Sequence, residues 1–174
     1  MPKRFILAPP LELDELAAYH RDVLASLGLY FSPSAPTFTE RFAGKTVREV
    51  NDELQSRLDE TDIRSTLAVL TSLEAHFRID FDFRCKERKK DLLSRHFRQV
   101  ERARGKNVRL DEDIFEGWKE HGSAPSAMIS QLRGAFKFRH WIAHGRYWNP
   151  KRKYDFTYSH LIAEGIITEL RLAY

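Results

Sequence analysis

The fold is decided by Ile63-Arg64-Ser65-Thr66-Leu67-Ala68-Val69-Leu70-Thr71-Ser72-Leu73-Glu74-Ala75-His76-Phe77. Its apolar positions return mainly at intervals of three and four residues, which is the period of one helix face and not the alternation of a strand. The face consists of Ile63, Leu67, Leu70, Leu73, Ala75 and Phe77. Because this is the most apolar helical segment of the chain, we expect it to be the central helix.

Helical spacing extends towards the N-terminus. Residues 11–29 carry apolar side chains at helical intervals, and a proline-containing loop follows them. The sequence Thr46-Val47-Arg48-Glu49 fits a capping box, in which the threonine hydroxyl accepts the glutamate amide while the glutamate carboxylate accepts the threonine amide. The sequence leaves open whether residues 59–62 interrupt the helix that begins there or continue it into Ile63–Phe77.

Further helices are expected towards the C-terminus. One covers residues 84–104 and ends at Gly105, and a short one covers residues 111–121. The next is capped by Ser123 or Ala124, has Pro125 in its first turn, and runs to His144, where Gly145 ends it. Thr157 or Ser159 opens the last helix.

Length and composition are typical of one globular domain. The chain has 174 residues, of which 42% are hydrophobic, and we find no repeat, no low-complexity tract and no convincing strand. A chain of this length can bury a substantial core. We therefore expect an all-α fold, a single-domain up-and-down helical bundle spanning residues 1–174.

The sequence favours a cytoplasmic protein that does not enter a membrane. No apolar run approaches the ~20 residues that span a bilayer. Residues 1–10 have a basic end, but their apolar run is too short for a signal peptide. The single cysteine, Cys85, cannot form an internal disulfide, which fits a reducing compartment. We interpret Cys85 as a buried or incidental thiol.

Positive charge is concentrated in residues 84–109. This basic segment contains eleven Lys and Arg side chains and three acids, so it carries +8 while the whole chain carries +4. Such a segment can attract an RNA backbone through counterion release, and Lys89, Lys90 and Arg95 are our candidates for that contact. The alternative is a solvated helix face without a ligand.

The strongest functional signal is Phe138-Arg139-His140-Trp141-Ile142-Ala143-His144-Gly145-Arg146-Tyr147-Trp148. Arginine presents a permanently charged, planar set of donors that suits phosphate oxygens. Histidine titrates near neutral pH, as a general acid or base requires. Arg139 and His144 can therefore bind a phosphodiester and move its protons without a metal, which is ribonuclease chemistry.

The hexapeptide Arg139 to His144 resembles the R-x4-6-H signature of the HEPN superfamily, in which a polar residue, here His140, follows the arginine. HEPN domains are small helical bundles that carry this signature on the penultimate long helix or at its end. The close resemblance covers about ten residues, and the expected helical layout agrees with it over most of the chain.

The resemblance implies a metal-independent endoribonuclease without cofactors, acting as a homodimer and serving as a toxin or antiviral defence effector. By this likeness His144 is the general base or acid, Arg139 holds the scissile phosphate, and His140 orients it. The substrate is RNA, because the ribose 2′-hydroxyl is the internal nucleophile and leaves a 2′,3′-cyclic phosphate.

Helix geometry sets a condition on this site. Residues five apart on an ideal helix point about 140° apart, at ~100° per residue. Arg139 and His144 therefore converge only if His144 lies on a distorted last turn, or if a partner chain supplies one of them. A symmetric dimer places the same patch of both chains at the two-fold axis.

Two further residues are identified through the resemblance. Some HEPN families place an acid on the central helix facing the motif, and Glu74 is the candidate here; an exposed carboxylate on the polar face is the alternative. Another variant has a tyrosine two residues after the histidine that a nucleotidyltransferase antitoxin modifies. In this chain Arg146 stands at that place and Tyr147 follows it, which weakens the expectation of such a partner.

Other site types have less support. His140 and His144 are spaced for zinc, but no third ligand accompanies them, so we expect no metal. No P-loop, dinucleotide fingerprint or nucleophile elbow is present. Tyr147 and Trp148, beside Arg146, can stack on unpaired bases or pack in an interface. The competing class is a non-catalytic helical RNA-binding or scaffold module of a defence or toxin–antitoxin complex.

Overall fold

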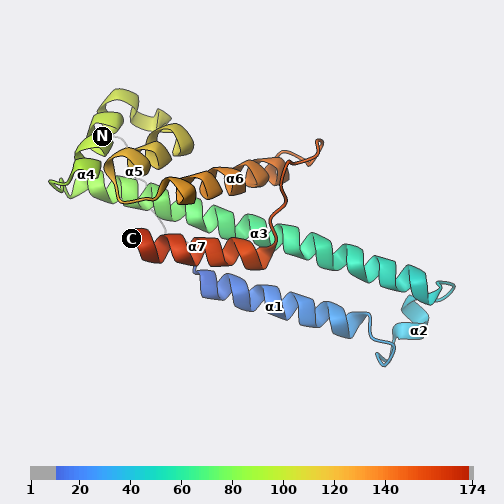
Figure 1. The fold of residues 1–174 in the computed structure, drawn as a ribbon. Coiled ribbons are helices and arrows are strands. Elements are labelled where there is room, and N and C mark those ends of the chain that lie inside the picture. The colour runs from blue at the N-terminus through green and yellow to red at the C-terminus, as the bar shows by residue number, and fades with distance from the viewer. Residues whose placement is uncertain (1–10, 173–174) are drawn as a thin grey trace.

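The computed structural model describes residues 11–172, and every regular element in that range is helical (Figure 1). The α-helices are α1 (Leu13–Tyr30), α2 (Phe38–Arg41), α3 (Val47–Lys86), α4 (Leu92–Arg104), α5 (Glu116–His121), α6 (Ser126–Ala143) and α7 (Phe156–Leu170). A 3₁₀ turn, Gly105–Asn107, and a π-helical segment, Leu110–Phe115, connect α4 to α5. The predicted all-α class is confirmed, while the interpretation of residues 1–10 lies outside the described range.

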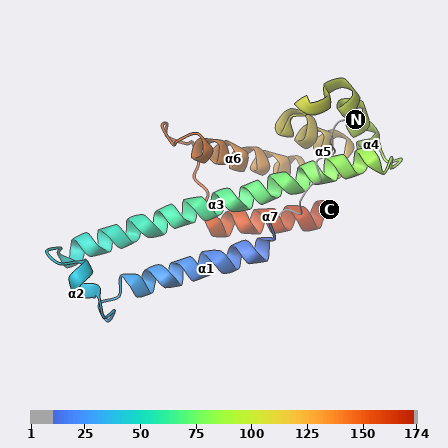
Figure 2. The same cartoon turned by 180° about the vertical axis from the view of Figure 1, so that it is seen from behind.

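The longer helices alternate in direction along the chain. Figures 1 and 2 show α1, α3, α6 and α7 running up and down, with α1 and α7 on one side of α3 and α6 on the other. The segment from α4 to α5 covers the C-terminal end of α3. Together the helices form one compact domain. No described helix is long and apolar enough to cross a membrane.

Helix α3 is the central element, as its apolar face predicted. Its capping box forms: the Thr46 hydroxyl accepts the Glu49 amide at 3.2 Å, and the Glu49 carboxylate accepts the Thr46 amide at 2.7 Å. The helix then continues for 40 residues through 59–62, which settles the question that the sequence left open. The side chains of Leu70, Leu73 and Phe77 are fully buried against the neighbouring helices.

The expected helix over residues 84–104 is two helices. Helix α3 ends at Lys86, and α4 begins at Leu92 after a turn in which Arg88 has a positive φ of 49°. Asp91 starts α4, because its carboxylate accepts the Ser94 amide at 2.9 Å. The predicted end of this helix at Gly105 is confirmed.

Two predicted helix starts were also displaced. Pro125 occupies the N-cap position of α6 with extended backbone, so neither Ser123 nor Ala124 caps it. Asp155 caps α7 by accepting the Tyr158 amide at 2.7 Å, two residues before the predicted Thr157. The Asp62 carboxylate of α3 accepts the Phe156 amide at 3.1 Å, a contact between distant parts of the chain.

The surroundings of His20, which is buried, and His96, which is half-buried, predict a pH-dependent stability. His20 stacks on Phe156 with ring centroids 4.0 Å apart, and burial lowers its pKa below the ordinary 6.5, against a raising effect of Asp62. Burial, and then the neighbouring His121, lower the pKa of His96. Below about pH 6.5 the unfolded chain therefore binds more protons than the folded chain at these sites.

We expect the free energy of unfolding to fall as the pH falls from 7.5 to 5.5. Denaturant titrations at several pH values measure this slope. A variant carrying His20→Gln and His96→Gln should lose most of it. A slope that the double variant retains in full would assign the pH dependence to other groups.

Candidate functional site

The C-terminal end of α6 presents the Arg–His motif. The helix ends at Ala143, and the amide of His144 still donates to the His140 carbonyl at 3.0 Å. Gly145 then takes a positive φ of 86°, which favours glycine, and the Arg146 amide donates to the Trp141 carbonyl at 3.1 Å. The predicted stop is confirmed, and it leaves His144 exposed at the helix end.

Arg139 points towards the central helix. Its Nη2 lies 2.9 Å from Oε2 of Glu74, and the other Glu74 oxygen accepts Nε of Arg78 at 2.7 Å. The Arg139 and Glu74 side chains are only 29% and 18% exposed, so this ion pair is partly shielded from water. The structure therefore places Glu74 against the motif, and the exposed polar-face alternative for this residue is wrong.

The two histidines of the motif form a separate group. The His140 and His144 rings lie one turn apart with centroids at 4.0 Å, and both residues are exposed. Arg139 instead faces α3, so Arg139 and His144 have different neighbours within one chain. This agrees with the divergence expected for residues five apart on a helix.

The loop after α6 is tied to α3 through Arg146. This residue has a positive φ of 57°, and its guanidinium contacts both oxygens of Glu60 at 2.6 and 3.1 Å. Hydrogen bonds from Arg146, and then from Arg64, lower the pKa of Glu60 to about 2. Arg146, which the sequence assigned to RNA binding, is therefore engaged in an internal ion pair.

The aromatic residues of this loop differ in their exposure. Tyr147 is 82% exposed and meets Trp148 edge to face at 4.5 Å. Trp148 is half-buried, and its carbonyl accepts the indole N–H of Trp141, which fastens the loop to α6. Tyr147 is thus available at the surface, whereas Trp148 is held against α6.

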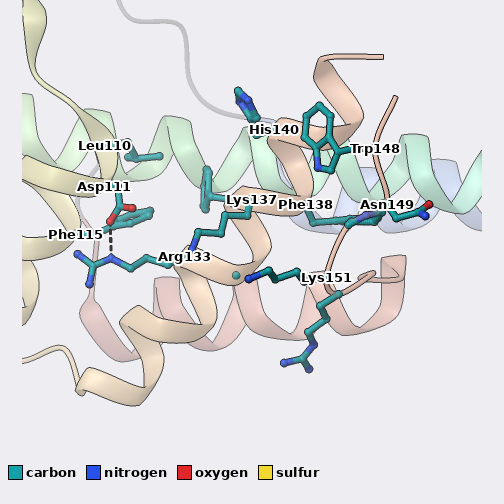
Figure 3. A pocket seen from close by; sticks show the side chains of 14 residues that line it. Leu110, Asp111, Phe115, Arg133, Lys137, Phe138, His140, Trp148, Asn149 and Lys151 are labelled. Atoms are coloured by element: carbon teal, nitrogen blue, oxygen red, sulfur yellow. Dashed lines mark hydrogen bonds and ion pairs between the residues drawn. The ribbon is translucent and has the colours of Figure 1, made fainter. Parts of the chain in front are cut away.

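Trp148 lines a pocket of about 600 Å³ on the side of α6 that carries His140 (Figure 3). Three segments line it: α6 between Arg133 and His140, the π-helical segment with Leu110 and Phe115, and the loop from Trp148 to Arg152. Sequence reasoning named His140 and Trp148 but missed the pocket. The available signal was Arg133 and Lys137, two cations four residues apart and therefore on one helix face.

The charges around this pocket are not equivalent. Arg133 is held by Asp111 and Glu116, each at 2.5 Å. Lys137 and Lys151 are exposed and have no carboxylate partner among the described residues. In Figure 3 their side chains extend, one from α6 and one from the loop, towards the same part of the pocket. Their charge is therefore free for an anionic ligand.

The close approach of the loop to α6 depends on Gly134. A Cβ added at this position would lie 2.3 Å from the Tyr154 hydroxyl, so glycine leaves the room that the buried Tyr154 side chain fills. Phe138 packs against both Tyr154 and Trp141 at the base of the loop. Packing thus fixes the position of the loop that closes the pocket.

The basic segment 84–109 lies towards the opposite end of α6 from the motif, as Figures 1 and 2 show for α4. Internal ion pairs engage part of its charge: Arg84 with Asp80 and Asp91, Lys86 with Asp82, Arg104 with Asp113, and Arg109 with Glu112. The candidates Lys89, Lys90 and Arg95 are exposed and form no ion pair within the described part of the chain, although Lys89 lies over the Phe83 ring.

If Lys89, Lys90 and Arg95 contact RNA, the effect of removing their charge on binding should depend on the length of the RNA. Neutralising Lys89, Lys90 and Arg95 together should weaken the binding of a long RNA and make its salt dependence shallower by about 2 to 3 in log–log slope, roughly one for each lost phosphate contact. A short oligonucleotide should be unaffected, because it cannot reach from the motif to α4. Binding isotherms over a salt series measure both effects. An unchanged slope for the long RNA would make the segment a solvated face.

Other reactive groups lie apart from the motif. Asp14, His160 and Glu164, between α1 and α7, have potential metal-ligand atoms within 4.8 Å of one another, and His160 Nε2 lies 3.2 Å from the Leu13 carbonyl oxygen. Burial, and then Glu101, raise the pKa of the Cys85 thiol to about 12, so this buried cysteine is a poor nucleophile.

Comparisons of the chain with protein-family models, with curated proteins and with solved structures found no match.

Proposed function

We propose that this protein is a metal-independent endoribonuclease of the HEPN type, a cytoplasmic homodimer that acts as a toxin or antiviral defence effector. The toxin or defence role comes from the motif resemblance and not from the site geometry. The site itself supports the reaction class.

The observation that carries the proposal is the contact between Glu74 and Arg139. It joins an acid of the central helix to the arginine of the motif, on the penultimate long helix, at 2.9 Å. A carboxylate that binds one guanidinium nitrogen fixes the direction of the others. The Nε of Arg139 is buried and donates to no atom of the described chain. The guanidinium is thus oriented by Glu74, with one buried donor left unpaired inside the fold.

The proposed reaction uses the ribose 2′-hydroxyl as nucleophile. Its oxygen attacks the adjacent phosphorus while the bond from phosphorus to the 5′-oxygen breaks. His144 accepts the hydroxyl proton while water protonates the leaving 5′-oxygen, or it protonates that oxygen while water accepts the hydroxyl proton, and its exposed position at the helix end allows either role. Arg139 stabilises the charge that develops on the phosphate. The products are a 2′,3′-cyclic phosphate and a 5′-hydroxyl.

A homodimer completes this site. Within one chain Arg139 faces α3, while His144 contacts His140. Two chains that meet through the ends of their α6 helices bring the arginine of one beside the histidine of the other. We therefore assign each catalytic centre to Arg139 and His144 from different protomers.

Substrates that differ only at the 2′ position test this function. We expect cleavage of a single-stranded RNA and none of the same sequence with 2′-deoxyribose throughout, because the internal nucleophile is then absent. Equal cleavage of both would exclude the mechanism. Binding of both without cleavage would instead favour the non-catalytic RNA-binding module.

Glu74 is expected to act as a positioning residue. Glu74→Gln should lower kcat by about ten- to a hundredfold, because the charge-assisted contact that orients Arg139 is weakened, while KM changes little. Arg78→Gln is the matched control, since it removes the other partner of Glu74 and leaves the contact with Arg139 in place. Single-turnover kinetics and thermal unfolding of both variants measure this. Equal losses in the two variants would show a structural role for Glu74.

A further inference from the structure

We infer that the pocket between α6, the π-helical segment and the Trp148–Arg152 loop binds a nucleobase together with its phosphate. The inference rests on the proposed function where it links this pocket to RNA cleavage, but the binding itself is independent of catalysis. The pocket lies outside the Arg139–His144 pair and supplies what that pair lacks, namely a surface for a base.

The size and lining suit a planar aromatic group. A volume of about 600 Å³ lies within the range of small-ligand sites, roughly 300 to 1,000 Å³. Phe136 and Trp148 are half-buried and contribute aromatic surface from α6 and the loop, while the fully buried Phe115 packs behind Phe136. Stacking on such rings is tolerant of base identity because every base has a π-face. The lining therefore favours a nucleobase without selecting one base.

The charges suit an anion at the rim. The lining contains four permanent cations, Arg133, Lys137, Lys151 and Arg152, and one carboxylate, Asp111. Asp111 is neutralised by Arg133 at 2.5 Å. Arg152 lies over the rings of Tyr154 and Tyr158. The ammonium groups of Lys137 and Lys151, in contrast, have no partner among the described residues. A phosphate that lies between these two lysines can form an ion pair with both ammonium groups.

His140 connects the pocket to the catalytic motif. It lines the pocket, its ring lies 5.9 Å from that of Trp148, and its other neighbour is His144 at 4.0 Å. A nucleotide whose base rests on Trp148 therefore has its ribose near the histidine pair. In the proposed enzyme the pocket holds an unpaired nucleotide next to the scissile bond, so the substrate is single-stranded at that position.

Equilibrium binding with two kinds of probe tests this inference. The first is each of the four common nucleoside 5′-monophosphates. The second is a short single-stranded RNA with 2′-O-methyl riboses, which cannot be cleaved by 2′-hydroxyl attack. Binding of the oligonucleotide alone assigns the pocket to RNA. Binding of the monophosphates as well assigns it to free nucleotides too.

Two variants of one loop supply the matched control. Lys151→Glu should weaken binding at least about tenfold, since it replaces an attractive charge with a repulsive one. Lys153 is an exposed residue of the same loop that does not line the pocket, so Lys153→Glu should change the binding affinity less than about twofold. Trp148→Leu should also weaken binding, whereas Trp148→Phe should retain most of it. Equal effects of the two lysine variants, or no binding of any probe, would overturn the inference.

These experiments distinguish a failure of nucleotide binding in the pocket from a failure of the proposed ribonuclease activity. Probe binding that depends on Lys151, in a protein that cleaves no RNA, would support the pocket and count against the nuclease. RNA cleavage by a protein in which Lys151→Glu and Lys153→Glu behave alike would support the nuclease and exclude the pocket as its base site.

Discussion

Replacing His144 by alanine is expected to abolish RNA cleavage, and so is replacing Arg139. We expect each variant to lose at least about a thousandfold in rate, because one change removes the group that moves the proton and the other removes the charge that stabilises the phosphate. Initial rates on a labelled single-stranded RNA measure both. Retained activity in either variant would contradict the assigned mechanism.

Matched controls separate catalysis from folding. His121→Ala removes another partly exposed histidine, which lies on α5 away from the motif, and should leave the rate unchanged. His144 is exposed at the end of α6, so its loss costs little packing. Loss of Arg139 leaves Glu74 paired with Arg78. Thermal unfolding of these variants should therefore lie close to that of the parent protein.

Mixing the two variants is expected to restore activity if each site is shared between two chains. In a heterodimer of Arg139→Ala and His144→Ala chains, one composite site lacks both groups and the other has both. With random exchange, half of the dimers are mixed and each has one intact site, so we expect about a quarter of the parent activity. Rates measured after unfolding and refolding the two chains together, against each chain treated alone, test this.

The outcome distinguishes a shared site from a site within one chain. No recovery in a sample that size-exclusion chromatography shows to be dimeric would place Arg139 and His144 in the same protomer's centre. Recovery well above a quarter would contradict one intact site per mixed dimer. A protein that remains monomeric at assay concentration, yet cleaves RNA, would also overturn the shared arrangement.

Features set by neighbouring residues could be predicted from the sequence. The Thr46–Glu49 capping box forms as expected, because its partners are three residues apart and the pairing is local. Gly145 ends α6 for a similar reason, since only its immediate backbone has to turn. Glu74 was a candidate through the family resemblance, as the acid of the most apolar helix, but the sequence left an exposed polar face open as the alternative; only the contact with Arg139 shows that it faces the motif.

Features that depend on competing or distant contacts could not be predicted. Asp155 caps α7 in place of Thr157 or Ser159, and Asp91 starts a helix that the sequence had not separated from α3, because a carboxylate accepts the N-terminal amides and favours the positive end of the helix dipole. The bond from Arg146 to Glu60 joins residues 86 positions apart. The pocket has walls from three separate segments, so the spacing of Arg133 and Lys137 on one helix face could not locate it alone.

Incubation of the purified protein with labelled single-stranded RNA in EDTA, beside His144→Ala, tests the central claim most directly. We expect cleavage that EDTA does not inhibit, product ends with 2′,3′-cyclic phosphate and 5′-hydroxyl groups, and no products from the variant. Cleavage that stops in EDTA, products with 3′-hydroxyl ends, or equal cleavage by His144→Ala would contradict it.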